Sequence, residues 1–334
     1  MSSRRQRSVL SLNMIEVREI RKSFGEVEAV AGVSFGVGAG EIFGFLGPNG
    51  AGKTTTINIL CTLVKPTSGS AALAGYDVVG QAGDVRASIG IVFQDPSLDE
   101  RLSAYENLSF HALVYSVPKA VRDERIFDVL SMVELWDRRH DVVRTFSGGM
   151  KRRLEIARGL LHHPKVLFLD EPTLGLDPQT RNRIWEFIRD LRDRENITIF
   201  LTTHYMDEAE NCDRIAVIDH GRIIALDTPG KLKTMVGGDV ITVSTADDET
   251  AAGQISAVHG LEVTARDGKL IFEVPEGETF LAPFVRSLDV PINSISLRRP
   301  TLDDVFLKLT GRTMRDESAG SLDSIRARVR MKRR

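Results

Sequence analysis

The chain has 334 residues, of which 42% are hydrophobic and 27% charged, so it can bury a large core and should hold two domains. Its formal net charge of −2 gives no general case for nucleic-acid binding, and its two cysteines, Cys61 and Cys212, have neither metal-ligand spacing nor a disulfide framework. No run of about eighteen apolar residues occurs, so we expect no membrane-spanning helix. If the protein acts at a membrane, we expect the membrane-spanning part to be a separate chain.

The first residues of the chain, 1–13, carry three arginines and no hydrophobic pattern, and we expect them to be disordered. From residue 14 to 227, strand and helix signals alternate, which predicts an α/β domain with a mostly parallel core sheet. Residues 14–46 and 70–78 are expected to form an antiparallel β flap on this domain.

A glycine-rich turn follows the buried-type strand expected at residues 42–46. The sequence Gly47-Pro48-Asn49-Gly50-Ala51-Gly52-Lys53-Thr54 fits G-x-x-x-x-G-K-[ST], and residues 54–63 predict a helix after it. In such a turn the backbone N–H groups bind phosphates, Lys53 adds positive charge and Thr54 offers a hydroxyl to Mg²⁺. The alternative is a tight turn that merely needs small residues.

Strand signals are absent between residues 94 and 164, where helices are expected at 104–114, 120–135 and 151–162. This region, about residues 95–164, is expected to form a helical subdomain. Ser147-Gly148-Gly149 precedes the third helix, and a hydroxyl with two glycines at a helix N-terminus can bind an anion. Three cations follow in the first turns of this helix, Lys151, Arg152 and Arg153. Positive charges are unfavourable near the positive end of the helix dipole, so we expect a phosphate or an acidic surface to face these side chains.

Two adjacent carboxylates, Asp170 and Glu171, end the apolar run 166–169, an unusual choice for a core. One interpretation gives Asp170 to Mg²⁺ and Glu171 to the attacking water, and the other leaves both solvated at the strand end. His204 follows a second buried-type strand at 197–201, where a lone histidine could equally be structural.

After residue 227 the pattern changes to short strand signals near 240–243, 269–273 and 292–297, with helices near 249–258 and 279–288. These signals predict a small α+β domain over residues 228–312, with a regulatory or dimerising role favoured over ligand binding. The expected last helix, 302–309, carries Val305, Phe306 and Leu309 on one face, which we expect to pack into a core. We expect residues 313–334 to be a basic, flexible tail, either a solvated end or a segment attracted to anionic lipids.

The four motifs together resemble the nucleotide-binding subunit of an ABC transporter. The stretch FSGGMKRRLEIARGLLHHPKVLFLDEPTLGLDP, residues 146–178, carries three of that family's signatures without a gap. Within the family, SGGM followed by KRRLEIARGL, the GLDP turn and the C-terminal PTLDDVF resemble the daunorubicin/doxorubicin-resistance type. The superfamily resemblance spans most of residues 14–227, and the weaker subfamily resemblance extends to about residue 312.

The resemblance implies a role for each matching residue. It makes Glu171, His204 and Lys53 catalytic, with Glu171 as the base and His204 as the γ-phosphate switch, and it assigns Mg²⁺ to Thr54, Gln94 and Asp170. ATP would be bound by residues of the phosphate loop, of the signature and of three further positions, namely Phe24, Gly47, Pro48, Asn49, Gly50, Ala51, Gly52, Lys53, Thr54, Thr55, Gln94, Ser147, Gly148, Gly149 and Asp177. On the residues alone, Phe24 could be a core aromatic, Gln94 a polar strand cap and Asp177 a turn residue.

The signature departs from the family pattern at Phe146, usually Leu, and at Met150, usually Gln. Met150 cannot make the hydrogen bonds of an amide, so a role for that side chain in aligning the phosphate helix is in doubt.

The implied function is ATP hydrolysis in a homodimer that drives a separate membrane permease, at the cytoplasmic face of the membrane, to export drug-like or hydrophobic compounds. The alternative is a non-transport ABC ATPase that acts on ribosomes or DNA. Such relatives carry tandem nucleotide domains or a long coiled coil, and neither pattern occurs in the sequence.

Overall fold

The computed structural model describes residues 13–95, 97–266 and 268–311. These residues form two compact units, and the chain passes from one to the other between Leu226 and Asp227. Of residues 1–13, which were expected to be disordered, only residue 13 is described, and the tail expected at 313–334 lies outside the described residues.

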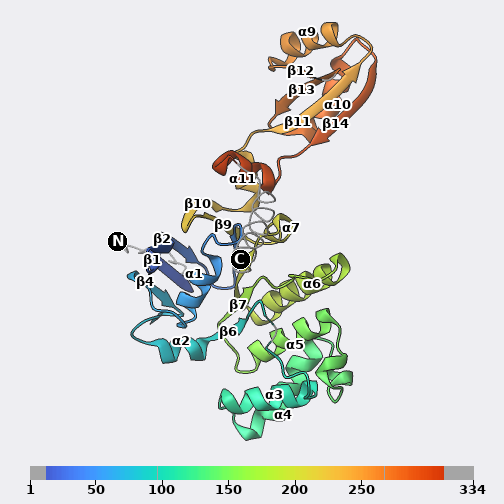
Figure 1. Cartoon of the computed structure of the whole chain (residues 1–334). Helices are drawn as coiled ribbons and strands as arrows, with labels where there is room; N and C mark the ends of the chain where they lie inside the picture. The colour runs from blue at the N-terminus through green and yellow to red at the C-terminus, as the bar shows by residue number, and fades with distance from the viewer. Residues whose placement is uncertain (1–12, 96, 267, 312–334) are drawn as a thin grey trace, which may run out of the picture. The chain divides into compact units, whose positions relative to one another are not determined.

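A six-stranded sheet with the order β10-β9-β3-β8-β7-β6 forms the centre of the first unit (Figure 1). The pairs that join β9, β3, β8, β7 and β6 are all parallel, as the alternating pattern predicts. Every residue of β3, β7 and β8 is buried, which is typical of parallel strands covered on both faces. The bounds are β3 Ile42–Leu46, β6 Ile89–Val92, β7 Val166–Asp170, β8 Thr198–Thr203, β9 Arg214–Asp219 and β10 Arg222–Asp227.

Aromatic side chains fill one side of this sheet. Phe35, Phe43, Phe45 and Phe200 pack together with ring centroids 5.4 to 5.8 Å apart, and Phe168 joins Phe200 at 5.4 Å. Offset aromatic pairs at such distances add to the stability gained from their buried area. This packed layer fixes β3, β7 and β8, whose carboxyl ends lead to the loop of Lys53, to Glu171 and to His204.

A second, antiparallel sheet consists of β1 Ile15–Phe24, β2 Val27–Val37, β4 Ser68–Leu73 and β5 Tyr76–Asp77, in the order β2-β1-β4-β5. It is the predicted flap, but it is shorter than expected. The expected flap range includes residues 42–46, but these residues belong to β3 of the parallel sheet, where all five of them are buried.

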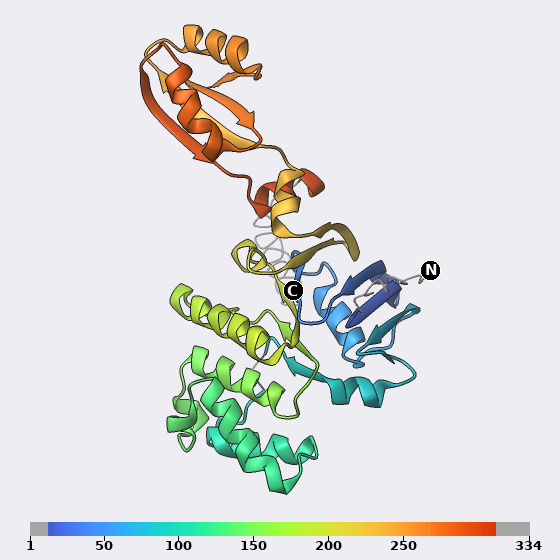
Figure 2. The same cartoon turned by 180° about the vertical axis from the view of Figure 1, so that it is seen from behind.

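Helices α3 Ala104–Val114, α4 Lys119–Met132 and α5 Gly148–Leu160 form the predicted helical region, which Figure 2 shows grouped below the core sheet. A capping box between Ser103 and Glu106 begins α3. The other helices of this unit are α1 Lys53–Leu60, α2 Ala82–Ser88, α6 Pro178–Glu195 and α7 Met206–Ala209, with short 3₁₀ turns η1 Trp136–Arg138 and η2 Val143–Thr145. Helix α1 ends before the predicted residue 63, because Thr62 takes a left-handed φ of 64°.

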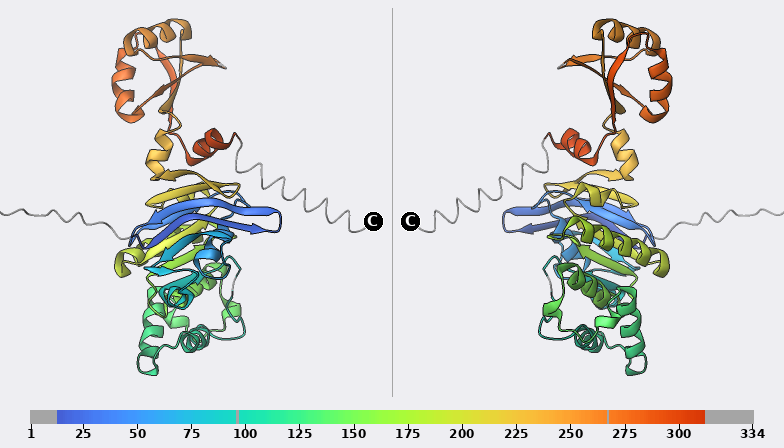
Figure 3. Two further views of the ribbon diagram at one scale, coloured as in Figure 1. Left: turned by 90° about the vertical axis from the view of Figure 1, so that its left-hand side faces the viewer. Right: turned by 90° about the vertical axis from the view of Figure 1, so that its right-hand side faces the viewer.

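The second unit contains the sheet β12-β13-β11-β14, covered by α9 Asp248–His259 and α10 Gly277–Ser287 (Figure 3). Its strands are β11 Asp239–Thr245, β12 Thr264–Arg266, β13 Lys269–Val274 and β14 Ile292–Arg298, and helices α8 Pro229–Thr234 and α11 Leu302–Thr310 pack on each other. The exposed strand β12 was not predicted. In α11, Val305 and Phe306 are buried as expected, whereas Leu309 is 41% exposed, so the prediction was wrong for Leu309.

Candidate nucleotide site

The glycine-rich turn, residues 47–52, connects β3 to α1 and wraps closely around its neighbours. A Cβ atom on Gly47 would lie 2.4 Å from the carbonyl oxygen of Ile218, and one on Gly52 would lie 2.5 Å from that of Ala29. Gly52 also has a φ of 105°. These positions therefore require glycine.

The ammonium group of Lys53 lies inside this turn. Its Nζ donates to the carbonyl oxygens of Gly47 over 2.7 Å and Pro48 over 3.1 Å, and the side chain is 5% exposed. Nζ also lies 3.4 Å from Oε1 of Glu171. The buried positive charge therefore links the loop after β3 to the carboxylate after β7.

Asp170 is the last residue of β7 and is buried beside hydroxyl groups. The hydroxyl of Thr202 donates to its Oδ1 over 2.5 Å. Burial raises the pKa of Asp170, while the hydroxyls of Thr202 and Thr54 and the charge of Lys53 oppose that rise. The structure thus brings Thr54 and Asp170 together, as the predicted metal site requires.

Glu171 follows Asp170, and its carboxylate lies between two basic side chains. Its Oε2 is 3.1 Å from Nδ1 of His204, and its Oε1 faces Lys53. Burial acts to raise the pKa of Glu171, but His204 and Lys53 outweigh it and hold the pKa below its usual value. The carboxylate is therefore ionised at neutral pH and able to accept a proton.

Helix α5 begins at Ser147, whose Oγ accepts from the backbone N–H of Met150 over 3.3 Å. Gly148 and Gly149 lie against the start of α6, since a Cβ atom on Gly149 would be 2.4 Å from Cγ2 of Thr180. The two departures from the usual signature both contact Arg138: its guanidinium lies over the ring of Phe146, and its Nη1 is 3.5 Å from Sδ of Met150.

The expectation that Lys151, Arg152 and Arg153 face a phosphate or an acidic surface was wrong for Arg152, which is buried, whereas Lys151 and Arg153 each face a carboxylate of the same chain. Lys151 pairs with Glu100, and Arg153 donates to Glu134 and to the carbonyl of Val133. Arg152 is buried and binds backbone carbonyls inside the first unit. All three cations have partners within the chain, which the local sequence could not reveal.

The remaining predicted residues lie at the ends of other elements. Phe24 ends β1 and is 52% exposed, with Nζ of Lys22 4.9 Å from its ring centroid. Gln94 is exposed after β6. Asp177 caps α6 and accepts from the backbone N–H of Thr180 over 3.0 Å. Asn49, Gly50 and Thr54 are exposed at the loop, Thr55 is half-buried, and Pro48 and Ala51 are buried.

Two residues beside the site were missed in the sequence. Thr202 binds Asp170 through its hydroxyl, and the backbone N–H of Glu171 lies within hydrogen-bond distance of both the Oγ1 and the carbonyl oxygen of Thr202. Glu208 is buried and accepts from the hydroxyl of Thr173, which joins the segment after His204 to the segment after Glu171. In the sequence, the two adjacent threonines 202 and 203 at the end of an apolar strand were the feature that could have indicated hydroxyl groups beside the site.

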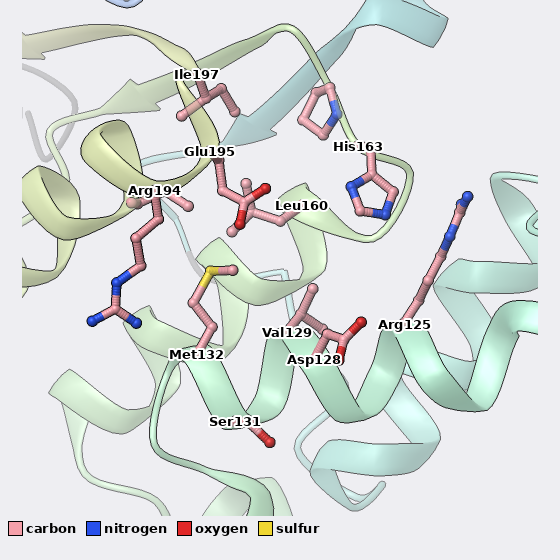
Figure 4. Close-up of a pocket in the computed structure, with 12 residues that line it drawn as sticks. Arg125, Asp128, Val129, Ser131, Met132, Leu160, His163, Arg194, Glu195 and Ile197 are labelled. Carbon is pink, nitrogen blue, oxygen red and sulfur yellow. The ribbon is translucent and has the colours of Figure 1, made fainter.

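A hollow of about 580 Å³ lies elsewhere, where the C-terminal ends of α4, α5 and α6 meet (Figure 4). It is lined by residues such as Arg125, Met132, His163 and Arg194, and none of the predicted site residues lines it. The predicted site residues therefore lie at the carboxyl edge of the sheet and not at this hollow.

Comparisons with known proteins agree with this geometry. The ABC transporter family matches residues 30–174, and the C-terminal domain of DrrA1-3-like ATP-binding proteins matches residues 228–310. The linearmycin resistance ATP-binding protein LnrL of Bacillus subtilis (strain 168) is 38% identical over 91% of this chain and 100% of its own length. The daunorubicin/doxorubicin resistance ATP-binding protein DrrA of Streptomyces peucetius is 40% identical over 91% of this chain and 94% of its own length.

Solved structures show the same fold. The protein cbiO1 from Clostridium perfringens, described as part of the ABC transporter complex cbiONQ, matches 73% of this chain and 95% of its own with a TM-score of 0.63 and 29% identity. The ATP-binding cassette MJ0796, described as dimeric and bound to ADP and Pi, matches 64% of this chain and 98% of its own, with a TM-score of 0.58 and 27% identity. This chain therefore belongs to the ATP-binding proteins of ABC transporters, of the antibiotic-resistance type, and is an ATPase.

Proposed function

We propose that two copies of this chain enclose two ATP molecules, and that each site combines the phosphate loop of one copy with the signature of the other. Lys53 and the loop backbone would hold the β- and γ-phosphates, and Ser147 and Gly149 of the second copy would complete the site. The observation that carries this proposal is the carboxylate of Glu171, held between Lys53 and His204 at the end of β7.

The residues beside the loop fit a magnesium ion. Mg²⁺ prefers oxygen ligands and is usually held by one or two carboxylates together with substrate phosphates. The hydroxyl of Thr54 and the carboxylate of Asp170 provide such oxygens side by side, and Gln94 would add an amide oxygen. When bound, the ion neutralises charge that develops on the phosphates.

Glu171 would act as the general base. Its carboxylate is ionised at neutral pH and lies next to the loop that would carry the γ-phosphate, so it can orient a water and accept its proton. His204, which contacts the same carboxylate, would fix the γ-phosphate and the water. Asp177 would act across the dimer, and Phe24 would stack on adenine.

The partner is proposed to be a separate permease, with this chain on the cytoplasmic face of the membrane. None of the described helices is long and apolar enough to span a bilayer. The permease would dock near residues 95–110, where Phe110 is 59% exposed. The names of the relatives, which describe resistance and export, favour export of a drug-like or hydrophobic compound over the ribosome or DNA alternative.

For the domains, we propose an ATPase domain over residues 14–227, with its helical subdomain at about 95–164, and an accessory regulatory domain over 228–312. The compact units and the two family matches support this division. The proposed roles of the tail, residues 313–334, concern a segment outside the described residues.

The test compares Glu171→Gln with Lys53→Ala in the full chain. Glu171→Gln should abolish turnover, keep ATP binding and trap a dimer in ATP, because only the base is lost. Lys53→Ala should weaken ATP binding itself. Nucleotide binding and size-exclusion chromatography with ATP distinguish the two. Near-normal hydrolysis by Glu171→Gln would remove Glu171 from the role of base.

A further inference from the structure

Arg152 lies in the first turns of α5 and is 7% exposed, although arginine is seldom buried in proteins without partners. Its guanidinium has five N–H donors, and the structure gives five hydrogen bonds for them. Nε donates to the carbonyl of Pro172 over 2.7 Å, and Nη2 donates to those of Asp170 over 3.0 Å and Glu171 over 3.1 Å. Nη1 donates to the carbonyl of Phe93 over 2.6 Å and to Oε2 of Glu155 over 3.1 Å.

Three of these acceptors are the successive carbonyls of residues 170–172, where the chain leaves β7. The middle residue, Glu171, has a φ of 46°, a left-handed conformation that is uncommon for any residue other than glycine. Such a conformation persists only where the surroundings fix it on several sides. Thr202 holds the N–H of Glu171, and Arg152 holds the carbonyls before, at and after it.

The fourth carbonyl belongs to Phe93, the residue before Gln94, and lies 59 positions from Arg152 in the sequence. One planar side chain therefore ties together the start of α5, the end of β7 and the segment that leads to Gln94. Glu155 supplies the balancing charge inside the protein and accepts from the backbone N–H of Ser97 over 2.8 Å.

We propose that Arg152 is a positioning residue for ATP hydrolysis: its guanidinium holds the backbone of Glu171 in the left-handed conformation that directs the carboxylate toward Lys53 and His204. The same guanidinium makes the segment before Gln94 move together with the helix that begins at Ser147. This inference rests on the proposed role of Glu171 as the base.

Lysine cannot replace this contact. An ammonium group has three donors at one point, whereas the guanidinium spreads five donors in a plane and reaches four carbonyls and a carboxylate at once. Arg152→Lys keeps the positive charge beside Glu155 but releases some of the carbonyls of residues 170–172. A shift of a catalytic group by about 1 Å can lower the rate by about 100-fold.

The test measures kcat, KM and binding of the slowly hydrolysed analogue ATPγS by the full chain. Arg152→Lys should lower kcat by about 10- to 100-fold, with KM and ATPγS affinity within about threefold of wild type. Arg153→Lys is the matched control, since Arg153 lies on the same helix but binds Val133 and Glu134, and should keep kcat within about twofold.

A double variant separates positioning from general stability. If Arg152 acts through Glu171, then Arg152→Lys combined with Glu171→Gln should be at most about twofold slower than Glu171→Gln alone, in single-turnover assays. If the single-turnover rate of the double variant is lowered by the product of the two single effects, the inference is overturned. Unchanged kcat in Arg152→Lys, with Glu171→Gln inactive, would also overturn it. An active Glu171→Gln would instead overturn the base assignment and this inference with it.

A second variant covers the case in which Arg152→Lys does not fold. Arg152→Gln with Glu155→Gln removes both buried charges together, so that neither is left unpaired. This pair should show the same selective loss of kcat while melting cooperatively. Normal kcat in this variant, with Glu171→Gln inactive, would also overturn the inference.

Discussion

Nδ1 of His204 lies 3.1 Å from Oε2 of Glu171. Glu171 directly follows strand β7 and His204 directly follows strand β8, so the residues after two parallel strands are in contact. The strands β7 and β8 that bring them together are direct neighbours in the sheet. The contact orients the ionised carboxylate of Glu171, and it supports the proposed role of His204 in the reaction.

We therefore expect His204→Ala to lower kcat by about 100-fold and to change ATP affinity by only a few-fold, because the loop and Lys53 remain. Steady-state ATPase rates and ATPγS binding measure the two effects. His220→Ala, on the exposed turn between β9 and β10, is the control and should behave like wild type. A His204→Ala variant with wild-type kcat would exclude His204 from the reaction.

The buried carboxyl of Glu208 predicts a pH-dependent stability. Burial raises its pKa from the ordinary 4.5 to about 7. Between these two pKa values the folded chain keeps a proton on Glu208 that the unfolded chain has released. The free energy of unfolding therefore falls as pH rises, by about 3 kcal/mol at most. This stabilisation is fully present below about pH 4.5 and is lost above about pH 7.

Glu208→Gln should remove this slope, because its amide does not titrate and can still accept from the hydroxyl of Thr173. Urea unfolding at several pH values between about 4.5 and 8 compares the variant with wild type. The exposed neighbour Glu210→Gln should keep the wild-type slope. If wild type and Glu208→Gln change in parallel with pH, Glu208 does not carry the effect.

Asp177 has a local role that can be separated from its proposed role across the dimer. It caps α6 by accepting from the N–H and the hydroxyl of Thr180, and these bonds lower its pKa. Asparagine is an equally good N-cap, so Asp177→Asn should keep the melting temperature while Asp177→Ala lowers it. If Asp177 also acts across the dimer, Asp177→Asn should reduce ATPase activity.

The matched control for this experiment is Asp247→Asn. Asp247 caps α9 in the second unit and accepts from the N–H and the hydroxyl of Thr250 in the same way. Asp247→Asn should change neither the melting temperature nor the ATPase activity. Full activity in Asp177→Asn would restrict Asp177 to its local role as a helix cap.

Much of the fold could be predicted from the sequence, because its signals are local. The buried run at β3, the glycine turn and the helix after it are adjacent in the chain, and the expected helix over residues 104–114 matches α3. Strand β12 was missed because Thr264, Ala265 and Arg266 are exposed and show no apolar alternation. The predicted flap range was too long because the apolar residues 42–46 could belong to the antiparallel or to the parallel sheet, and the sequence does not show which strands pair with them.

Contacts in the site could be predicted only between residues that belong to recognisable sequence motifs. Lys53, Asp170, Glu171 and His204 end or follow consecutive strands of the sheet, so their meeting follows from the parallel topology. The place of Arg152 did not follow, because four of its five acceptors are backbone carbonyls that lie 18 to 59 residues away and have no residue signature. The left-handed φ of Glu171 has no sequence signal either.

The most direct test of the composite site mixes two inactive variants. Ser147→Arg blocks the signature of one subunit, and Lys53→Ala disables the phosphate loop of the other. A heterodimer of the two then retains one intact site, formed by Lys53 of the Ser147→Arg chain and Ser147 of the Lys53→Ala chain.

Differently tagged variants are purified together, and their ATPase rate is compared with that of each variant alone. The account predicts that activity returns on mixing, up to about half the wild-type rate per heterodimer if the two sites act independently. No recovery, with heterodimers demonstrated by tandem affinity purification, would contradict an independent site shared between two chains.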